Sequence, residues 1–213
     1  MRDASQFQSL PQLVGGILIG GASRRMGCAK ALLDWQGETF VERIASALAT
    51  VVPEVVLLGS GIALPPKVAH LQVLADSGQE SGPLAGLLTA FRYRPGAAWL
   101  IATCDQPLLS TATLAWLIGE RRSDRIAVLP RLVPGRIEPF PGLYEPACAA
   151  ALAKLAGPDS RSSLQPLAAV PGVHLLDVPA GLVVELTGVN RRDELEALRR
   201  EAALVAKDPD CDR

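Results

Sequence analysis

Two glycines and two basic residues follow the first apolar run of the chain. Gly20 and Gly21 come directly after that run, and Arg25 and Lys30 lie a few positions further on. Glycines at such a turn let backbone N–H groups approach an anion closely, and the two cations suit a polyphosphate. The loop is neither a Walker A motif, which needs Gly-Lys-Ser/Thr, nor a GxGxxG fingerprint. The alternative is an ordinary strand-to-helix turn with solvated Arg and Lys.

A carboxylate follows a second apolar run. Asp105 stands in the segment Thr103–Pro107, directly after the predicted strand Trp99–Ala102. A carboxylate at the end of a buried strand is well placed to hold Mg²⁺, which prefers oxygen ligands and bridges to substrate phosphates. The alternative is an Asx-turn, in which the Asp side chain bonds its own backbone.

A third loop combines an acidic residue with a glycine-rich helix entry. Asp76 ends a short predicted strand, and Gly82-Pro83-Leu84-Ala85-Gly86 opens a predicted helix. Read without the other loops, this segment fits simple loop and helix-cap chemistry equally well.

The elements that must position these residues alternate along the chain. Predicted strands are Val14–Ile19, Val55–Leu58, Gln72–Leu74, Trp99–Ala102 and Ile126–Leu129, and predicted helices are Phe40–Ala49, Pro83–Tyr93 and Thr113–Arg121. This alternation predicts βαβ units and a mostly parallel sheet. The loops after parallel strands emerge at one sheet edge, where ligands of open α/β sheets bind. Their convergence favours a nucleotide–Mg²⁺ site.

The last third of the chain has a different character. Glu138–Tyr144 is rich in Pro and Gly, and Arg192–Val205 carries one apolar face opposite its charges. The remaining predicted elements are a helix, Pro146–Leu155, and two strands, Val173–Asp177 and Leu182–Leu186. We expect one domain spanning residues 1–213, with 1–12 and 207–213 as flexible tails.

Composition narrows the class of protein. Twenty-one Lys+Arg against 22 Asp+Glu give a formal net charge of −1, which argues against a nucleic-acid polymer or an anionic membrane surface as the main partner. No apolar stretch is long enough to span a bilayer, and the first residues carry no signal-peptide pattern, so we expect a cytoplasmic protein. The 4 cysteines are widely scattered, which makes a zinc site improbable and indicates reduced thiols.

Taken together, the three loops resemble those of the MobA-type molybdenum cofactor guanylyltransferases. That family shows Leu-Ala-Gly-Gly, then Arg-Met-Gly and Lys, and Leu18–Gly21, Arg25-Met26-Gly27 and Lys30 are similar to it. The likeness continues through Gly82–Gly86 and Cys104-Asp105-Gln106-Pro107, with weaker similarity at Glu138–Tyr144 and Val189-Asn190. Related cytidylyl and sugar-phosphate transferases carry Leu-Ala-Ala-Gly in the first loop, so the double glycine resembles the guanylyl branch.

The resemblance implies a three-layer, Rossmann-like α/β nucleotidyltransferase fold with a mostly parallel mixed sheet. It also implies transfer of GMP from GTP to molybdopterin, with Mg²⁺ as cofactor and molybdoenzyme chaperones as further partners. Asp105 would hold the metal, Arg25 and Lys30 would stabilise the departing pyrophosphate, and Asn190 with Glu138–Tyr144 would face the acceptor. The nucleotide contacts implied are Leu18, Ile19, Gly20, Gly21, Lys30, Asp76, Gly82 and Asp105.

The sequence also departs from the family pattern. Ile19 replaces an alanine and puts bulk beside the nucleotide, and Ala29 stands where an aspartate often precedes the lysine. Leu58 with Gly59, and Gly188, occupy places where the family offers asparagines. Two alternatives therefore stay open: a MobA-like cytidylyl or sugar-1-phosphate nucleotidyltransferase, and a catalytically inactive nucleotide-binding accessory protein.

Overall fold

A seven-stranded mixed sheet forms the centre of the computed structural model, which describes residues 10–20, 29–76, 82–132, 136–156 and 163–205. The strand order is β5-β4-β1-β6-β8-β7-β9. The strands are β1 (Leu13–Leu18), β4 (Val55–Leu58), β5 (Gln72–Leu74), β6 (Ala98–Thr103), β7 (Ala127–Arg131), β8 (Gly142–Tyr144) and β9 (Val173–Asp177). The first four in spatial order are parallel, and β8 runs antiparallel to both of its neighbours. The mostly parallel mixed sheet predicted from sequence is confirmed.

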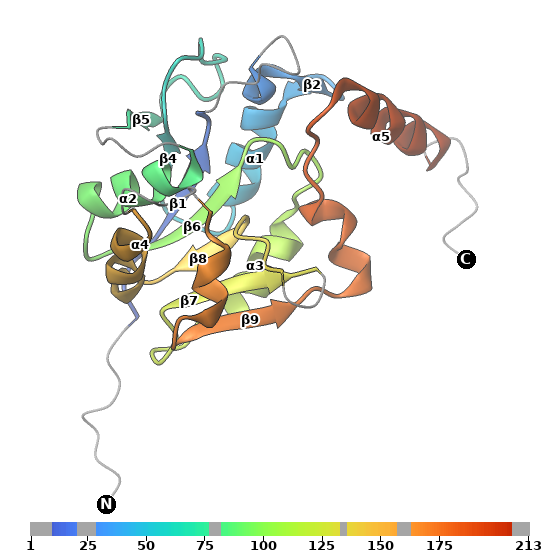
Figure 1. Cartoon of the computed structure of the whole chain (residues 1–213). Helices are drawn as coiled ribbons and strands as arrows, with labels where there is room; N and C mark the ends of the chain where they lie inside the picture. The colour runs from blue at the N-terminus through green and yellow to red at the C-terminus, as the bar shows by residue number, and fades with distance from the viewer. Residues whose placement is uncertain (1–9, 21–28, 77–81, 133–135, 157–162, 206–213) are drawn as a thin grey trace, which may run out of the picture.

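Helices cover both faces of the sheet and complete three layers (Figure 1). Helices α1 (Phe40–Ala49) and α3 (Thr111–Gly119) pack on one face, and α2 (Pro83–Tyr93) and α4 (Ala149–Leu155) pack on the other. Strands β1, β4 and β6 are almost wholly buried, as expected for parallel strands covered on both sides. Each parallel strand therefore delivers the loop that follows it to the same edge.

Most elements predicted from the apolar patterns are confirmed, and one is wrong. The predicted strand Leu182–Leu186 falls on two 3-10 helices, η5 (Ala180–Leu182) and η6 (Val184–Leu186). A short apolar run does not distinguish strand from helix, and here Glu185 fixes the segment by accepting hydrogen bonds from Ser110 N and Thr113 Oγ1. Helix α3 begins two residues before its predicted start, and the first turn of the predicted helix Pro146–Leu155 is the 3-10 helix η3 (Pro146–Cys148).

The C-terminal helix packs beside a small hairpin. Helix α5 (Arg192–Val205) contacts the hairpin of β2 (Asp34–Trp35) and β3 (Glu38–Thr39) through a cluster of Trp35, Phe40, Val189 and Leu195. Arg199 Nη2 also donates to the Asp34 carbonyl. The 3-10 helix η2 (Lys30–Leu32) immediately precedes the hairpin, so this packing brings the chain before α5 next to Lys30.

Two residues near the start of the chain contact the rest of the structure. The predicted tails fall mostly outside the described residues, although Pro11 and Gln12 accept hydrogen bonds from Arg121 and Ala98. Within the described ranges, none of the helices has the length and apolar character needed to cross a bilayer.

Candidate active site

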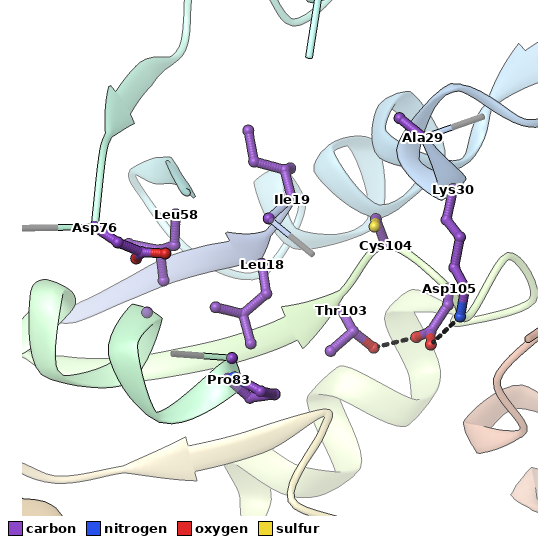
Figure 2. Close-up of a pocket in the computed structure, with 13 residues that line it drawn as sticks. Leu18, Ile19, Ala29, Lys30, Leu58, Asp76, Pro83, Thr103, Cys104 and Asp105 are labelled. Carbon is purple, nitrogen blue, oxygen red and sulfur yellow. Dashed lines mark hydrogen bonds and ion pairs between the residues drawn. The ribbon is translucent and has the colours of Figure 1, made fainter. Parts of the chain in front are cut away.

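A pocket of about 320 Å³ opens at the carboxyl ends of β1, β4 and β6 (Figure 2). This volume lies within the range of small-molecule sites. Its lining comes from every loop singled out in the sequence: Leu18, Ile19, Gly20, Ala29, Lys30, Leu58, Asp76, Gly82, Pro83, Gly86, Thr103, Cys104 and Asp105. The expected convergence of the three loops on one sheet edge is confirmed.

Asp105 and Lys30 form the charged end of the pocket. Lys30 Nζ lies 3.4 Å from Asp105 Oδ2, and the two side chains are 19% and 24% exposed. Thr103 Oγ1 donates a 2.5 Å hydrogen bond to Asp105 Oδ1, which fixes the rotation of the carboxylate. The charged pair is thus oriented by the last residue of β6 while remaining open to a ligand.

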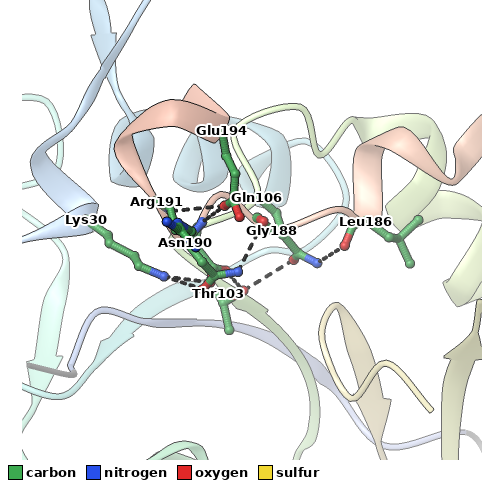
Figure 3. A network of polar contacts seen from close by, with 9 residues as sticks. Lys30, Thr103, Gln106, Leu186, Gly188, Asn190, Arg191 and Glu194 are labelled. Atoms are coloured by element: carbon green, nitrogen blue, oxygen red, sulfur yellow. Dashed lines mark hydrogen bonds and ion pairs between the residues drawn. The ribbon is translucent and has the colours of Figure 1, made fainter. Parts of the chain in front are cut away.

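Asn190 joins this pair from the far end of the sequence (Figure 3). Its Oδ1 accepts a 2.6 Å hydrogen bond from Lys30 Nζ. Glu194, in the first turn of α5, accepts from the backbone N–H groups of Asn190 and Arg191 at 2.6 and 3.0 Å. A carboxylate at a helix N-terminus stabilises both the unpaired amides and the helix dipole, so it holds Asn190 in place.

Gln106 ties two chain segments to the Asp105 loop. The side chain is 4% exposed, and its Nε2 donates to the carbonyls of Phe140 and Leu186 at 2.8 and 2.9 Å. The backbone of the same loop takes part as well, because Val189 N donates to the Asp105 carbonyl at 2.7 Å. These bonds place residues 186–190 beside the Asp105 carboxylate.

Two glycines bring the loops after β1 and β4 into contact. Gly59 has φ +110°, and an added Cβ would lie 2.7 Å from Gly20 N and 2.9 Å from Gly20 Cα. Both the backbone conformation and the close approach therefore require glycine at position 59. Position 59 therefore offers the pocket no side chain.

Asp76 stands across the pocket from the charged pair (Figure 2). An added Cβ on Gly20 would lie 3.9 Å from Asp76 Oδ2, so the carboxylate borders the glycine loop. Partial desolvation raises the pKa of Asp76 above its usual range, yet the residue stays exposed. The two ends of the pocket thus differ in chemistry: Asp76 lies beside a glycine backbone at one end, and a cation is paired with a carboxylate at the other.

Burial raises the pKa of two further groups, Cys104 and Glu138. Burial raises the pKa of the Cys104 thiol to about 12, so it stays protonated near neutral pH and offers no thiolate nucleophile. Burial also raises the pKa of Glu138; the positive charge of Arg136 opposes this shift, and the negative charge of Asp105 adds a smaller contribution to it.

Comparison with known proteins identifies the family. The family described as "MobA-like NTP transferase domain" matches residues 15–170. The chain belongs to this family. The resemblance inferred from the loop motifs is confirmed, and the chain is a nucleotidyltransferase by membership.

Individual relatives agree with this assignment. A Bacillus cytotoxicus protein named "Probable molybdenum cofactor guanylyltransferase" is 32% identical over 161 residues, 73% of this chain and 80% of the relative. The structure of molybdopterin-guanine dinucleotide biosynthesis protein A from Archaeoglobus fulgidus superposes with a TM-score of 0.71 at 20% identity, over 89% of this chain and 98% of that one. The structure of Rv0371C from Mycobacterium tuberculosis, solved as a complex with manganese, superposes with a TM-score of 0.60 at 19% identity, over 89% of this chain and 98% of that one. The two structures establish the fold.

The structure brings most of the predicted site residues of this MobA-like chain together. Seven of them line the pocket: Leu18, Ile19, Gly20, Lys30, Asp76, Gly82 and Asp105. Arg25 and Gly21 lie outside the described residues. Ile19 is only 5% exposed and belongs to the cluster on the α1 face, so its packing in the core absorbs much of the bulk expected beside the nucleotide. Asn190 reaches the site through Lys30.

Sequence reasoning gave no role to three residues that shape the site: Thr103, Gln106 and Gly59. Thr103 and Gln106 lie close to Asp105 in the sequence, but the sequence does not show their hydrogen-bond partners. Thr103 bonds the Asp105 side chain, and Gln106 bonds the distant carbonyls of Phe140 and Leu186. The sequence signal for Thr103 was that it is the one polar residue at the end of an otherwise apolar strand. The requirement for glycine at position 59 follows only from its backbone angle and its distance to Gly20.

The donor set limits how a metal can be held. Among the described residues, no group of three or more His, Cys, Asp or Glu side chains is placed to hold an ion. Asp105 is the one carboxylate at this end among the described residues that line the pocket. Mg²⁺ is commonly bound by one or two carboxylates together with substrate phosphates and water, so the site fits a metal that shares its ligands with the nucleotide.

Proposed function

We propose that this chain is a molybdenum cofactor guanylyltransferase that transfers GMP from GTP to the terminal phosphate of molybdopterin. The observation that carries the proposal is the meeting of Lys30, Asp105 and Asn190 at one end of a pocket whose other end carries Gly20 and Asp76. The name of the Bacillus cytotoxicus relative supports the choice of nucleotide and acceptor.

The reaction demands positioning and charge neutralisation from the protein. An oxygen of the acceptor phosphate attacks the α-phosphorus of GTP, the bond from that phosphorus to the β-bridging oxygen breaks, and pyrophosphate leaves. The acceptor phosphate is already ionised near pH 7, so no general base is needed. Reactions of this class depend on holding the attacking and leaving oxygens in line.

Each charged residue has a defined part in that arrangement. Lys30, with Arg25 from outside the described residues, stabilises negative charge on the departing pyrophosphate. Asp105 would hold Mg²⁺, which would supply positive charge to neutralise the phosphates. Asp76 and the Gly20 backbone bind the nucleoside, while Asn190 and residues 138–144 face the acceptor.

Base selection is expected to be modest. At the Gly20–Gly59 contact the pocket offers backbone and no side chain, and Leu58 and Gly59 have no side-chain group that could hydrogen-bond a base. Hydrogen bonds supply most of the discrimination between similar ligands. We expect GTP to be preferred over ATP, CTP and UTP by about 1–3 kcal/mol.

The test supplies reduced molybdopterin, Mg²⁺ and each nucleoside triphosphate in turn and measures release of pyrophosphate. GTP should give the highest kcat/KM, and Asp105→Asn should lower turnover at least roughly 100-fold while leaving the thermal unfolding temperature near that of the wild type. A preference for CTP would assign the chain to the cytidylyl branch. Nucleotide binding without pyrophosphate release would instead identify an accessory protein.

A further inference from the structure

The ammonium of Lys30 lies beside the carboxylate oxygen that a metal would use. Asp105 Oδ1 is already engaged by the Thr103 hydroxyl, and Oδ2 is 3.4 Å from Lys30 Nζ (Figure 2). Asn190 Oδ1 contacts the same ammonium at 2.6 Å. A cation built into the chain therefore already lies beside Asp105 and neutralises its charge.

We infer that Lys30 is a resident cation that keeps a divalent metal off Asp105 until a triphosphate draws the ammonium away. The inference rests on the proposed role of Asp105 as metal ligand. A metal bound to Oδ2 would bring two further positive charges within a few ångströms of Nζ, and like charges at that distance repel strongly where water is partly excluded. Binding is then ordered, with the metal entering together with the nucleotide.

The lengths of the two contacts of Lys30 Nζ show that the one with Asp105 breaks more easily than the one with Asn190. Charge-assisted hydrogen bonds are usually about 2.7–2.9 Å long, so the 3.4 Å contact with Asp105 is loose and the 2.6 Å contact with Asn190 is tight. Glu194 fixes the backbone at Asn190. Lys30 can therefore release Asp105 and turn towards a phosphate while it keeps Asn190 as its pivot.

The test measures Mn²⁺ binding to the nucleotide-free protein from the electron paramagnetic resonance signal of unbound Mn²⁺. Wild-type protein should bind Mn²⁺ weakly, and Lys30→Met should raise the affinity at least about tenfold, because the competing charge is gone. The double variant Lys30→Met/Asp105→Asn should lose the gain. Lys30→Gln provides a second neutral side chain if Lys30→Met unfolds.

A matched control removes the same charge elsewhere. The exposed Lys67 pairs through Nζ with the half-buried Glu38 at 2.8 Å, away from the pocket of Lys30 and Asp105. Lys67→Met therefore changes the net charge equally without touching that pocket. Equal affinities for the wild type and both Lys30 variants would overturn the inference, as would an equal gain from Lys67→Met or a gain that survives Asp105→Asn. The measurement needs neither GTP nor acceptor, so its result is independent of whether guanylyl transfer is observed.

Discussion

Asn190 accepts a 2.6 Å hydrogen bond from the ammonium of Lys30 across 160 positions of the chain. Two contacts hold it there: Glu194 binds the backbone N–H of Asn190, and Val189 N donates to the Asp105 carbonyl. The segment before α5 is thus part of the charged end of the pocket, although it lies beyond the residues that match the family domain.

Asn190→Ala should lower kcat/KM for the acceptor about tenfold, because a hydrogen bond to a charged group contributes about 1.5–3 kcal/mol and this one is exposed. Pyrophosphate release measured at saturating GTP with the acceptor concentration varied gives this ratio. Asp193→Asn is the matched control, since it removes only an exposed ion pair with Arg191 and should leave turnover near the wild-type value. If Asn190→Ala behaves like that control, Asn190 has no part in the reaction.

Gly59→Ala should weaken GTP binding, because its Cβ would collide with the backbone of Gly20. Gly61→Ala is a closely matched control: Gly61 also has a positive φ, +91°, but an added Cβ there meets nothing within 4 Å. Both variants should lose about 1 kcal/mol or more of stability to backbone strain. Calorimetry should show an affinity loss of at least roughly tenfold for Gly59→Ala beyond that of Gly61→Ala. Equal affinities would show that the Gly20–Gly59 contact does not shape the nucleotide site.

The apolar patterns predicted the sheet well because burial dictates them. Strands β1, β4 and β6 are apolar throughout, and α1 repeats its apolar residues at helical spacing, so each element could be recognised from its own sequence. The run 182–186 was misassigned because hydrogen bonds from α3 to Glu185, and not its own pattern, decide its conformation. Strand β8 was missed because only three residues pair and they follow a Pro/Gly-rich turn.

The candidate site was predictable only in part. Gly20, Asp76 and Asp105 could be placed on one edge because parallel strands share a direction. The contacts that orient them could not, since they join distant segments. The bonds from Gln106 to Phe140 and Leu186 span 34 and 80 positions, and no local spacing records them.

Gln106→Met should raise KM for the acceptor much more than KM for GTP. The substitution keeps the length of the side chain but leaves the carbonyls of Phe140 and Leu186 without their donor, at a cost of about 1–3 kcal/mol for each buried group. Residues 138–144 and 186–190 would then loosen beside Asp105, whereas the nucleotide loops would keep their contacts. Steady-state kinetics with each substrate varied in turn measures the split.

Two further observations separate positioning by Gln106 from general destabilisation. Amide hydrogen exchange at Val189 should accelerate in Gln106→Met, because its bond to the Asp105 carbonyl depends on the same segment. Tyr144→Phe is the control: it removes the 2.6 Å bond to the Pro139 carbonyl without touching Leu186. The Tyr144 variant should leave exchange at Val189 unchanged. A parallel rise in both KM values would argue against a role confined to the acceptor side.

Glu42 should make the stability of the chain depend on pH through the N-terminus of α1. The backbone N–H and then the hydroxyl of Thr39 hold the pKa of Glu42 below its ordinary value of 4.5. The unfolded state therefore binds more protons than the folded state in the interval between the two values, and stability rises with pH across it. The contribution is fully present above the unfolded value and is lost as pH falls through the folded one.

Glu42→Gln removes that titration while keeping an oxygen that can accept from Thr39 N. Denaturant unfolding near pH 7 should show a loss of about 0.3–1 kcal/mol, the usual contribution of a carboxylate in the first turn of a helix. The difference from wild type should shrink as pH falls below 4.5 and should vanish once Glu42 is protonated in the folded state as well. Thr39→Ala keeps the backbone donor and loses the hydroxyl. The pH dependence of its unfolding free energy should therefore lie between those of the wild type and Glu42→Gln. A constant difference between wild type and Glu42→Gln at all pH values would mean that packing, and not the charge of Glu42, stabilises the start of α1.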